Sequence, residues 1–449
     1  MVTPKDCVWG KEFFDTYMKH AKKTSYNNEE LHQVASLSLI GQSIRNVRLR
    51  ADQTWIDCRI HPFIIQSSGT GKNSAFNFMG TVSKAAGYSF EEHGKDSTAG
   101  IMGTVRRNGE VDKGDLAGSG FVAWKESQQL LKAAKSEHSS DLLEVINQAL
   151  DPSGKVSRSL SGGKLEYNSR TSLFCTTYPP QPNGQLELVH QGFLPRTVFL
   201  YRRLDEDFYD FVNEKRDNNL PKVGKSNTNY IGEYEDDVQK LANTLKYIED
   251  TVWEYGDVMR EKDSHYAQGR EHIMYFEGVD EGVSLNPSPV IDDILSDYPY
   301  KIRNIAKPFK TRMFDMTYKI AACLAAVDYD EETDVYVSRI IRERHAKQAK
   351  KLVGKSFENI VRFIQDYMVE TGDEDLNRLE STIEEICRND SGQATVRELM
   401  IETTRKKRDI KDDIATLQEM GKIEAEKNPH TLEVDDKVQY IDNPDVLRY

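Results

Sequence analysis

The sequence predicts an α/β core followed by a helical C-terminal half. Between residues 55 and 205, short apolar runs alternate with helical or glycine-containing segments, as buried strands joined by crossovers do. The runs are FII at 63–65, FVAW at 121–124, LFC at 173–175 and VFLY at 198–201. Beyond residue 205 the strand signal fades, and apolar residues recur at helical spacing.

The composition limits the class of protein. The chain has 449 residues and a formal net charge of −13, from 60 Lys and Arg against 73 Asp and Glu. At about 150 residues per domain, this length suggests two or three domains. There is no run of about 18 apolar residues, so we expect no membrane span. The N-terminus lacks the apolar stretch of a secretion signal, and the five cysteines form no CxxC pair. We expect a cytoplasmic protein, in the cytosol of a prokaryote or of a virus-infected host cell.

The segments outside the strands have helical patterns. The first fifty residues predict helices and end in a basic stretch at 45–50. Apolar residues from Val238 to Val252 step by three and four along one helix face. Residues 312–327 and 334–364 are also predicted to be helical. We therefore divide the chain into a short helical segment at 1–50, an α/β core at 51–205, a helical segment at 206–365 and a last domain at 366–449.

The last domain has the pattern of a winged helix. Residues 376–386, 396–403 and 410–420 predict three helices, and Gly421 would cap the third. The sequence KIEAEKNPHTLEV that follows predicts two strands around an Asn-Pro turn. The Leu and Ile stripe of the three helices is assigned to the core of this domain rather than to a binding surface.

The segment 63–74, FIIQSSGTGKNS, is the strongest single motif. An apolar strand runs into a glycine-containing loop whose Lys72 precedes a helix. In such a loop, backbone N–H groups surround a phosphate, the helix N-terminus adds positive potential, and the lysine reaches the phosphate oxygens. Gln66 and Asn73 depart from the pattern GxxxxGK[ST], and an ordinary Gly-Ser turn is the alternative. The expected nucleotide-binding residues of the loop are Ser68, Gly69, Thr70, Gly71, Lys72, Asn73 and Ser74.

Three further blocks complete a resemblance to the minichromosome maintenance (MCM) family of AAA+ helicases. Residues 96–127 (DSTAGIMGTVRRNGEVDKGDLAGSGFVAWKES) resemble the family segment that ends in a strand and an Asp-Glu pair. Residues 168–180 (NSRTSLFCTTYPP) are similar to its N-A-R-T-S strand, and residues 192–207 (GFLPRTVFLYRRLDED) to its L-x-S-R-F-D segment. The resemblance covers about residues 60–205 and extends more loosely to 310–352 and the winged helix. The first fifty residues hold no counterpart of the family's N-terminal DNA-binding collar.

The resemblance implies an AAA+ P-loop ATPase core with a helical lid, which uses ATP and Mg²⁺. The family's Asp-Glu pair falls on Lys125 and Glu126, so Glu126 would orient the attacking water. Lys125 stands where the family has a magnesium-organising aspartate. The amide oxygen of Asn73 would then contact the metal or a water bound to it. Thr177, beside Tyr178, is assigned to the first sensor of the γ-phosphate.

Two arginines are implied to act on the nucleotide as well. Arg196 matches the arginine that the family projects into the neighbouring subunit's nucleotide, where a guanidinium suits the charge on the γ-phosphoryl group. Arg312 resembles the second-sensor arginine at the start of a lid helix. For Arg196 the alternative is a local salt bridge. For Arg312 the alternative is a match without functional meaning, because arginines often precede apolar helices.

Two predicted hairpins and one helix are the expected DNA contacts. Arg106 and Arg107 adjoin an Asn-Gly turn, and residues 155–170 flank a Ser-Gly-Gly turn. Basic hairpin tips can follow the phosphates of a strand without reading bases. The alternative for each hairpin is a solvated turn, and a winged helix can bind protein instead of DNA. The expected DNA-binding residues are Arg106, Arg107, Lys155, Arg158, Lys164, Lys407 and Arg408.

These expectations favour an ATP-driven, MCM-like motor that assembles as a ring, a hexamer in this family, and translocates on or unwinds DNA during replication. The missing collar points to a plasmid, virus or mobile element. One alternative is a replication initiator or helicase loader. Another is a nucleotide-binding AAA+ scaffold or switch with little ATPase activity, which Lys125 and Asn73 favour. The acidic net charge predicts weak, salt-sensitive DNA binding that depends on assembly.

Overall fold

The computed structural model describes most of the chain, in two compact units. The described residues are 2–24, 29–51, 54–67, 70–93, 98–125, 127, 140–151, 154–160, 163–179, 193–202, 228–262, 274–275, 278–330, 335–366, 370–389, 392–403, 406–419 and 422–441. The first unit comprises Met1–Pro180, Gly184–Pro287 and Thr311–Asn359. The second comprises Ser288–Lys310, Ile360–Tyr449 and the short piece Gln181–Asn183, which lies outside the described residues.

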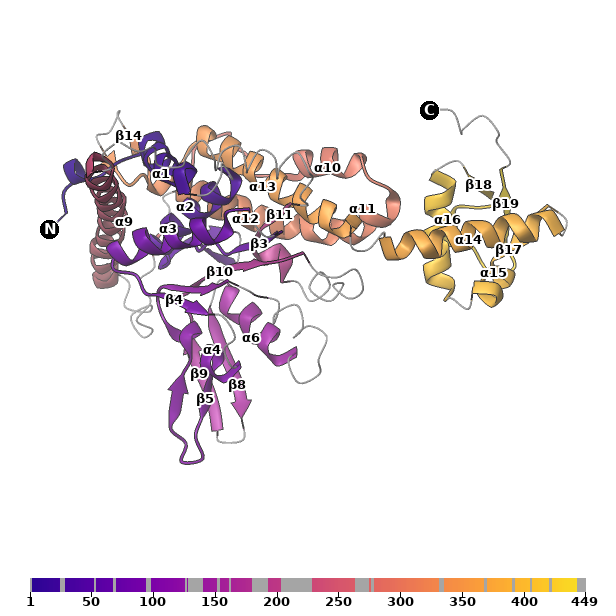
Figure 1. The fold of residues 1–449 in the computed structure, drawn as a ribbon, viewed down its shortest axis with the longest axis horizontal. Helices are drawn as coiled ribbons and strands as arrows, with labels where there is room; N and C mark the ends of the chain where they lie inside the picture. The colour runs from indigo at the N-terminus through magenta and orange to yellow at the C-terminus, as the bar shows by residue number, and fades with distance from the viewer. Residues whose placement is uncertain are drawn as a thin grey trace. The chain divides into compact units, whose positions relative to one another are not determined.

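A five-stranded parallel sheet forms the centre of the first unit (Figure 1). Its order is β11-β3-β10-β7-β4, and the strands are β3 (Pro62–Gln66), β4 (Phe90–His93), β7 (Phe121–Trp124), β10 (Ser172–Thr177) and β11 (Val198–Arg202). Every residue of β3, β7 and β10 is buried, which is why these strands read as unbroken apolar runs. The predicted α/β class is confirmed, and the four predicted strands are present.

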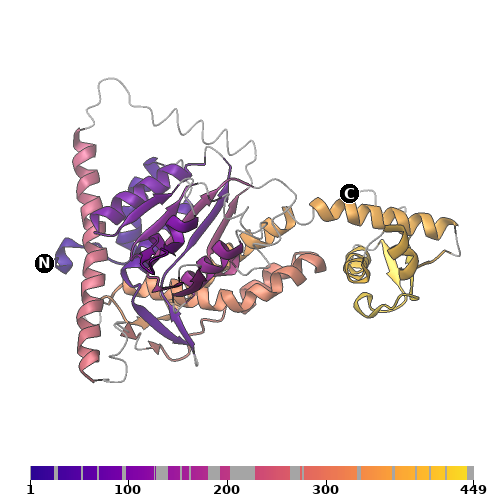
Figure 2. The ribbon, with the colours of Figure 1, turned by 90° about the horizontal axis from the view of Figure 1, so that it is seen from below.

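Four helices from distant parts of the chain form one layer beside the sheet. They are α1 (Lys11–Thr24), α2 (Glu29–Ser43), α3 (Lys72–Ala85) and the 35-residue α9 (Thr228–Lys262). Figure 2 shows α9 as a long straight rod along one side of this unit. Asp237 of α9 accepts a hydrogen bond from Lys19 Nζ at 2.9 Å and lies 2.7 Å from His20 Nε2. Segments 1–50 and 206–365 therefore both contribute to the unit that holds the sheet.

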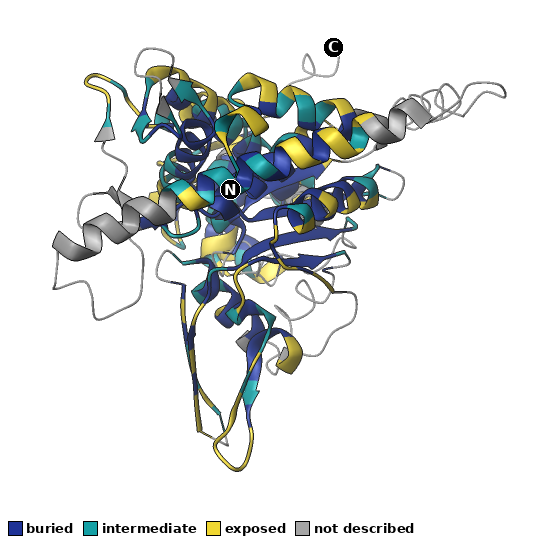
Figure 3. Cartoon of the chain, turned by 90° about the vertical axis from the view of Figure 1, so that its left-hand side faces the viewer, coloured by how far each residue is buried: buried dark blue, intermediate teal, exposed yellow. Residues whose placement is uncertain are grey.

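Two hairpins project from the connections of the sheet (Figure 3). The turn of the first, at 106–110, is exposed, and the turn of the second, at 161–162, lies outside the described residues. After α4 (Thr98–Met102), β5 (Gly103–Val105) pairs with β6 (Val111–Lys113). After α6 (Ser140–Leu150), β8 (Lys155–Leu160) pairs with β9 (Gly163–Asn168). Tyr167 Oη donates to the Met102 carbonyl at 2.9 Å, so the two hairpins lie side by side. Both hairpins expected from the sequence are present.

The remainder of the first unit holds α12 (Lys310–Ala326, from Thr311 on), most of α13 (Glu343–Ile364) and short strand pairs. The pairs involve β1 (Val47–Ala51), β2 (Thr54–Asp57), β12 (Met274–Tyr275), β13 (Gly278–Val279), β14 (Tyr329–Asp330), β15 (Val335–Tyr336) and β16 (Ile340–Ile341). The prediction of a helix from residue 334 was wrong at its start. Tyr336 stacks on Tyr329 at 4.6 Å between ring centroids, and β16 pairs with β13, so α13 begins only at Glu343.

Beside the 3₁₀ turn η6 (Pro429–Thr431), the described residues of the second unit form six further complete helices or helical turns and a small antiparallel sheet. They are α10 (Ser288–Ser296), α11 (Tyr300–Ala306), η4 (Lys307–Phe309), α14 (Glu370–Asn389), α15 (Val396–Thr403) and α16 (Lys407–Glu419), with the sheet β17 (Ala394–Thr395), β19 (Lys437–Tyr440) and β18 (Ile423–Ala425). The three predicted helices are present, and their Leu and Ile stripe is core, as expected. The second predicted strand is misplaced. Asn428 caps His430 N in the 3₁₀ turn η6 (Pro429–Thr431), so β18 pairs with 437–440 instead.

A buried ionic cluster lies at the amino end of the sheet. The guanidinium of Arg59, 0% exposed, contacts the carboxylate of Asp57 at 2.6 Å and donates to the carbonyls of Thr171 and Ala149, each at 2.9 Å. Lys319 Nζ of α12 lies 3.3 Å from Asp57 Oδ1. Burial opposes ionisation of Asp57, but Arg59 and Lys319 hold its pKa well below the usual range. The cluster therefore joins β2, α6, β10 and α12.

Replacing the centre of this cluster tests its role in stability. We expect Arg59→Met to lower the free energy of unfolding by about 3–5 kcal/mol, because it leaves a buried carboxylate with one partner fewer. All four tryptophans, Trp9, Trp55, Trp124 and Trp253, lie in the first unit, so tryptophan fluorescence during urea unfolding reports on this unit. Arg106→Met removes an exposed ion pair and is the control, with an expected change below about 1 kcal/mol. Equal losses in the two variants would contradict this role.

Candidate functional site

Lys72 holds together two strands at the carboxyl edge of the sheet. It is the first residue of α3, and only 7% of it is exposed. Its ammonium donates to the carbonyl of Gln66, the last residue of β3, and to that of Thr177, the last residue of β10, the latter at 3.0 Å. The ring centroid of Tyr178 lies 4.1 Å from the same nitrogen. A buried ammonium is thereby fixed where two parallel strands end.

The loop before Lys72 and the first turn of α3 have the geometry of an anion site. Gly71 is the N-cap of α3 at φ +80°, a conformation that favours glycine. Thr70 is buried, and its hydroxyl donates to the Ser67 carbonyl at 3.2 Å. The unpaired amides of a helix N-terminus next to an ammonium attract an anion. Asn73 is exposed and Ser74 is half-buried, whereas Ser68 and Gly69 lie outside the described residues.

Thr177 brings a further polar group to this edge. Its side chain is fully buried, and its hydroxyl oxygen has no hydrogen-bond partner among the described residues. A buried hydroxyl without a partner costs free energy, so such a group is expected to have a ligand or water partner. The predicted loop residues Thr70, Gly71 and Lys72 thus lie together with the predicted sensor residue Thr177.

Lys125 lies at the carboxyl end of β7, next to β10. Its ammonium is 2.6 Å from Glu92 Oε2 of β4 and 4.8 Å from the ring centroid of Phe76 in α3. Its own carbonyl accepts a hydrogen bond from Thr176 Oγ1 at 2.7 Å. Glu126, the predicted water-orienting residue, lies outside the described residues.

Among the described residues at this edge, the donor set does not fit a magnesium ion held by the protein. Mg²⁺ prefers carboxylate and other oxygen ligands. At the position expected to supply a carboxylate, Lys125 presents an ammonium already paired with Glu92. Asn73, the one predicted metal contact, is on the exposed side of the first turn of α3. Within the described residues, no group of three His, Cys, Asp or Glu side chains could hold a metal ion.

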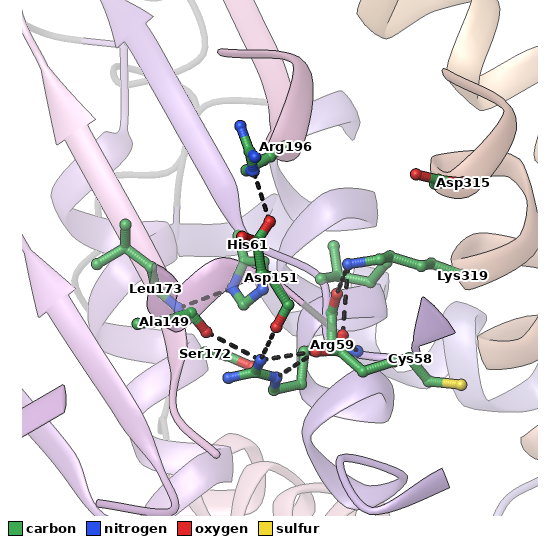
Figure 4. Close-up of polar contacts among 12 residues, drawn as sticks. Cys58, Arg59, His61, Ala149, Asp151, Ser172, Leu173, Arg196, Asp315 and Lys319 are labelled. Carbon is green, nitrogen blue, oxygen red and sulfur yellow. Dashed lines mark hydrogen bonds and ion pairs between the residues drawn. The ribbon is translucent and has the colours of Figure 1, made fainter. Parts of the chain in front are cut away.

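Arg196 and Arg312 lie together, but at the opposite edge of the sheet (Figure 4 shows Arg196 and its surroundings). Both line a small cavity of about 20 Å³ with Asp151, Asp315 and Lys319. Arg196 Nε is 2.9 Å from Asp151 Oδ1, and an Arg312 nitrogen is 3.6 Å from an Asp315 oxygen. Burial raises the pKa of Asp315 although Arg312 is near.

The register of β11 and β3 measures this separation. Arg196 precedes β11, whose Val198 pairs with Pro62, the first residue of β3. The phosphate loop follows Gln66, the last residue of β3. At roughly 3.3 Å per residue, the length of β3 keeps the two groups about 13 Å or more apart. The predicted arginines and the predicted loop residues therefore do not form one site within a single chain.

The basic residues of the hairpins are largely paired with acids. Glu166 accepts from Lys155 at 2.9 Å and from Lys164 at 2.6 Å, and these bonds lower the pKa of Glu166 to about 2. Arg106 Nε is 2.6 Å from Asp112 Oδ2. Arg158 contacts the Met102 sulfur at 3.8 Å, and Arg107 is exposed. All five predicted residues lie on two adjacent hairpins.

In the second unit, the two predicted DNA-binding residues open α16. Lys407 pairs with Glu433, and Arg408 is exposed. Asp409 and Asp412 lie on the same helix, so this surface carries both signs of charge.

A cavity of about 760 Å³ lies elsewhere in the first unit, among α1, α2, α12 and α13. Its wall includes Asp328, which accepts from Arg344 Nε at 2.9 Å and contacts His345 Nε2 at 2.7 Å. Burial alone would raise the pKa of Asp328, but the hydrogen bonds from His345 and Arg344 lower it. None of the residues expected from the sequence lines this cavity. Its size alone does not make it the functional site, because the convergent ammonium, glycine turn and helix N-terminus lie around Lys72.

Several residues of these sites carry no local signal in the sequence. Lys319 is far in sequence from Asp57 and Arg59, which lie at and just after the end of a short strand. Nothing in the spacing of the three residues indicates a buried cluster. Glu92, which pairs with Lys125, lies in a strand with three polar residues in a row, FEEH, that was not predicted.

Comparison with known proteins adds no relative: no protein-family model matches the chain, and no curated protein matches its sequence. Among the described residues, no helix is long and apolar enough to cross a membrane.

Proposed function

We propose that this chain is an ATP-binding AAA+ protein of the MCM-like type, which assembles as a ring, a hexamer, and moves along or unwinds DNA. The observation that carries the proposal is Lys72, buried at the carboxyl ends of β3 and β10 at the start of α3. An ammonium, a left-handed glycine N-cap and a helix N-terminus without a side-chain cap suit the phosphates of a nucleotide. In open parallel sheets, ligands bind outside the carboxyl ends of the strands, where this group lies.

The arrangement of the other elements supports the AAA+ interpretation. The two hairpins lie between β4 and β7 and between β7 and β10, and they are the elements that the MCM resemblance assigns to DNA contact. The helices α14, α15 and α16 with the sheet β17-β19-β18 fit a winged helix. The helices from 310 to 364 would serve as the lid of the ATPase core.

The two edges of the sheet suggest how a ring would complete the site. Arg196 and Arg312 cannot reach a phosphate held by Lys72 of the same chain, because β3 separates them. In a ring of identical subunits joined head to tail, the sheet edge that carries Arg196 and Arg312 (the arginine edge) in one subunit faces the sheet edge that carries Lys72 in the next. A guanidinium supplied across the interface would then stabilise the charge of phosphoryl transfer.

DNA would contact the two hairpins in this proposal. The hairpin of β8 and β9 has three basic residues, Lys155, Arg158 and Lys164, against the single acid Glu166. Glu166 pairs with both Lys155 and Lys164, so phosphates would compete with its carboxylate for these two lysines. Such contacts follow the backbone without reading sequence and weaken with salt.

A second candidate function is a nucleotide-binding AAA+ scaffold or switch that turns over little ATP. The Lys125–Glu92 pair favours it, because a lysine occupies the position of a magnesium-organising carboxylate. The two candidates share the nucleotide site and differ in hydrolysis.

The first test of the motor is ATP hydrolysis by the full chain with and without forked DNA. We expect DNA-stimulated phosphate release that falls about a hundredfold in Lys72→Ala, since a fixed charge on the phosphates is lost. Lys84→Ala changes an exposed lysine in the last turn of the same helix and should leave turnover unchanged. Nucleotide binding without turnover in the unmodified protein would favour the switch over the motor.

A complementation test addresses the arginine across the interface. Lys72→Ala and Arg196→Ala subunits should each be inactive alone. Mixed in equal amounts, they should recover about a quarter of the unmodified activity, because one interface in four joins an intact Lys72 to an intact neighbouring Arg196. No recovery, in mixtures shown by native mass spectrometry to contain both subunits, would contradict action in trans.

The hairpin proposal is tested by the salt dependence of DNA binding. We expect Arg158→Ala with Lys164→Ala to weaken binding of single-stranded DNA and to reduce the salt slope by about 1 to 2, as lost phosphate contacts do. Glu166→Gln should strengthen binding, because it removes the carboxylate that competes with phosphate for Lys155 and Lys164. Fluorescence anisotropy at several salt concentrations measures both. If only Lys407→Ala changes the slope, the contact lies on α16 rather than on the hairpins.

A further inference from the structure

Two contacts connect Lys125 with the elements that hold Lys72, namely β10 and α3. Adjacent residues of β10 contact the two lysines: Thr176 donates to the Lys125 carbonyl at 2.7 Å, and the Thr177 carbonyl accepts from Lys72 at 3.0 Å. The ammonium of Lys125 also lies 4.8 Å from the ring centroid of Phe76, one turn into the helix that Lys72 begins. Lys125 therefore faces the first turns of α3 from the strand beside β10.

The Lys125 side chain is held in place, and its ammonium can still donate hydrogen bonds to a ligand. Glu92 Oε2 lies 2.6 Å from its ammonium, and the aromatic face of Phe76 supports it. An ammonium has three N–H donors, so the bond to Glu92 leaves donors for a further acceptor. About one third of the side chain, 32%, is exposed, so a ligand can reach it.

We propose that Lys125 takes the electrostatic place of the divalent cation, so that this site binds nucleotide phosphates without Mg²⁺. The inference rests on the proposed nucleotide site, and it concerns the cation that the site requires. Phosphate oxygens that a metal would otherwise neutralise receive charge from two ammonium groups, Lys72 and Lys125. A lysine at position 125 would also repel a divalent cation there, so the side chain that supplies the charge disfavours the metal.

The pair with Glu92 gives this role a specific geometry. Glu92 is on β4, the edge strand next to β7, and its carboxylate orients the Lys125 ammonium at the carboxyl end of these two strands. It also lowers the net positive charge of the site before ligand binds. A phosphate would add an acceptor to an ammonium already oriented, and lysine acts on phosphate as such a point charge.

The test measures the affinity of the full chain for ADP and for ATP by isothermal titration calorimetry, in Mg²⁺ and in EDTA. For the unmodified protein we expect the two dissociation constants of each nucleotide to agree within about threefold. Lys125→Met keeps an aliphatic stem over Phe76 and removes the charge, and it should weaken binding in EDTA about tenfold or more. Lys125→Asp should weaken binding in EDTA further and recover it in Mg²⁺. Lys125→Arg should retain binding in EDTA.

Controls separate this inference from the proposed function. Lys84→Ala should bind as the unmodified protein does in both buffers, and the unfolding temperature of each variant shows that it is folded. Binding that needs Mg²⁺ in the unmodified protein, or that Lys125→Met leaves unchanged in EDTA, would overturn the inference and leave the nucleotide site intact. If neither nucleotide binds in either buffer, or if binding survives Lys72→Ala, the proposed function fails, and this inference fails with it.

Discussion

The guanidinium of Arg59 joins parts of the first unit that are distant in sequence. It satisfies the carboxylate of Asp57 and two carbonyls, one at the end of α6 and one before β10, while Lys319 brings α12 to the same carboxylate. Beside them, His61 Nδ1 accepts from the Leu173 amide at 3.2 Å, and burial lowers the pKa of His61, which keeps its imidazole neutral. Two buried cations and one carboxylate are tolerated only because carbonyls share the charge.

This cluster also fixes the position of Arg196 at the amino edge of the sheet. Arg59 contacts the carbonyl of Asp151 at 3.3 Å, and the side chain of Asp151 holds Arg196. At the other edge, Lys72 fixes β3 to β10. The parallel sheet between them is a rigid spacer, so the two charged groups face opposite directions. In the proposed function, each edge would supply half of a phosphate-transfer site, which is the physical basis for proposing a ring.

Local patterns in the sequence were enough for four of the five strands of the sheet and not for their charged partners. The apolar runs at β3, β7, β10 and β11 predicted the core because buried parallel strands need apolar residues on both faces. The strand β4 was missed, since Glu91 and Glu92 interrupt its apolar pattern at the edge of the sheet. Lys72 was predicted from its loop, but the Glu92–Lys125 pair joins residues 33 positions apart and has no local pattern. The pairing of the hairpin lysines with an acid could have been predicted, because Glu166 lies two residues beyond Lys164 on the same strand face. The layer of α1, α2 and α9 depends on contacts across more than 200 residues, such as that of His20 with Asp237, which periodicity does not reveal.

The central claim is that Lys72 and Arg196 act on one nucleotide from neighbouring subunits, and a structure of the assembled protein tests it most directly. Electron cryo-microscopy of the full chain with an ATP analogue and forked DNA should show closed rings. The analogue should lie at Lys72 of one subunit, with the Arg196 guanidinium of the next about 3 Å from its terminal phosphate. A monomer with bound nucleotide, or a ring in which Arg196 stays on Asp151 and faces no phosphate, would contradict the account.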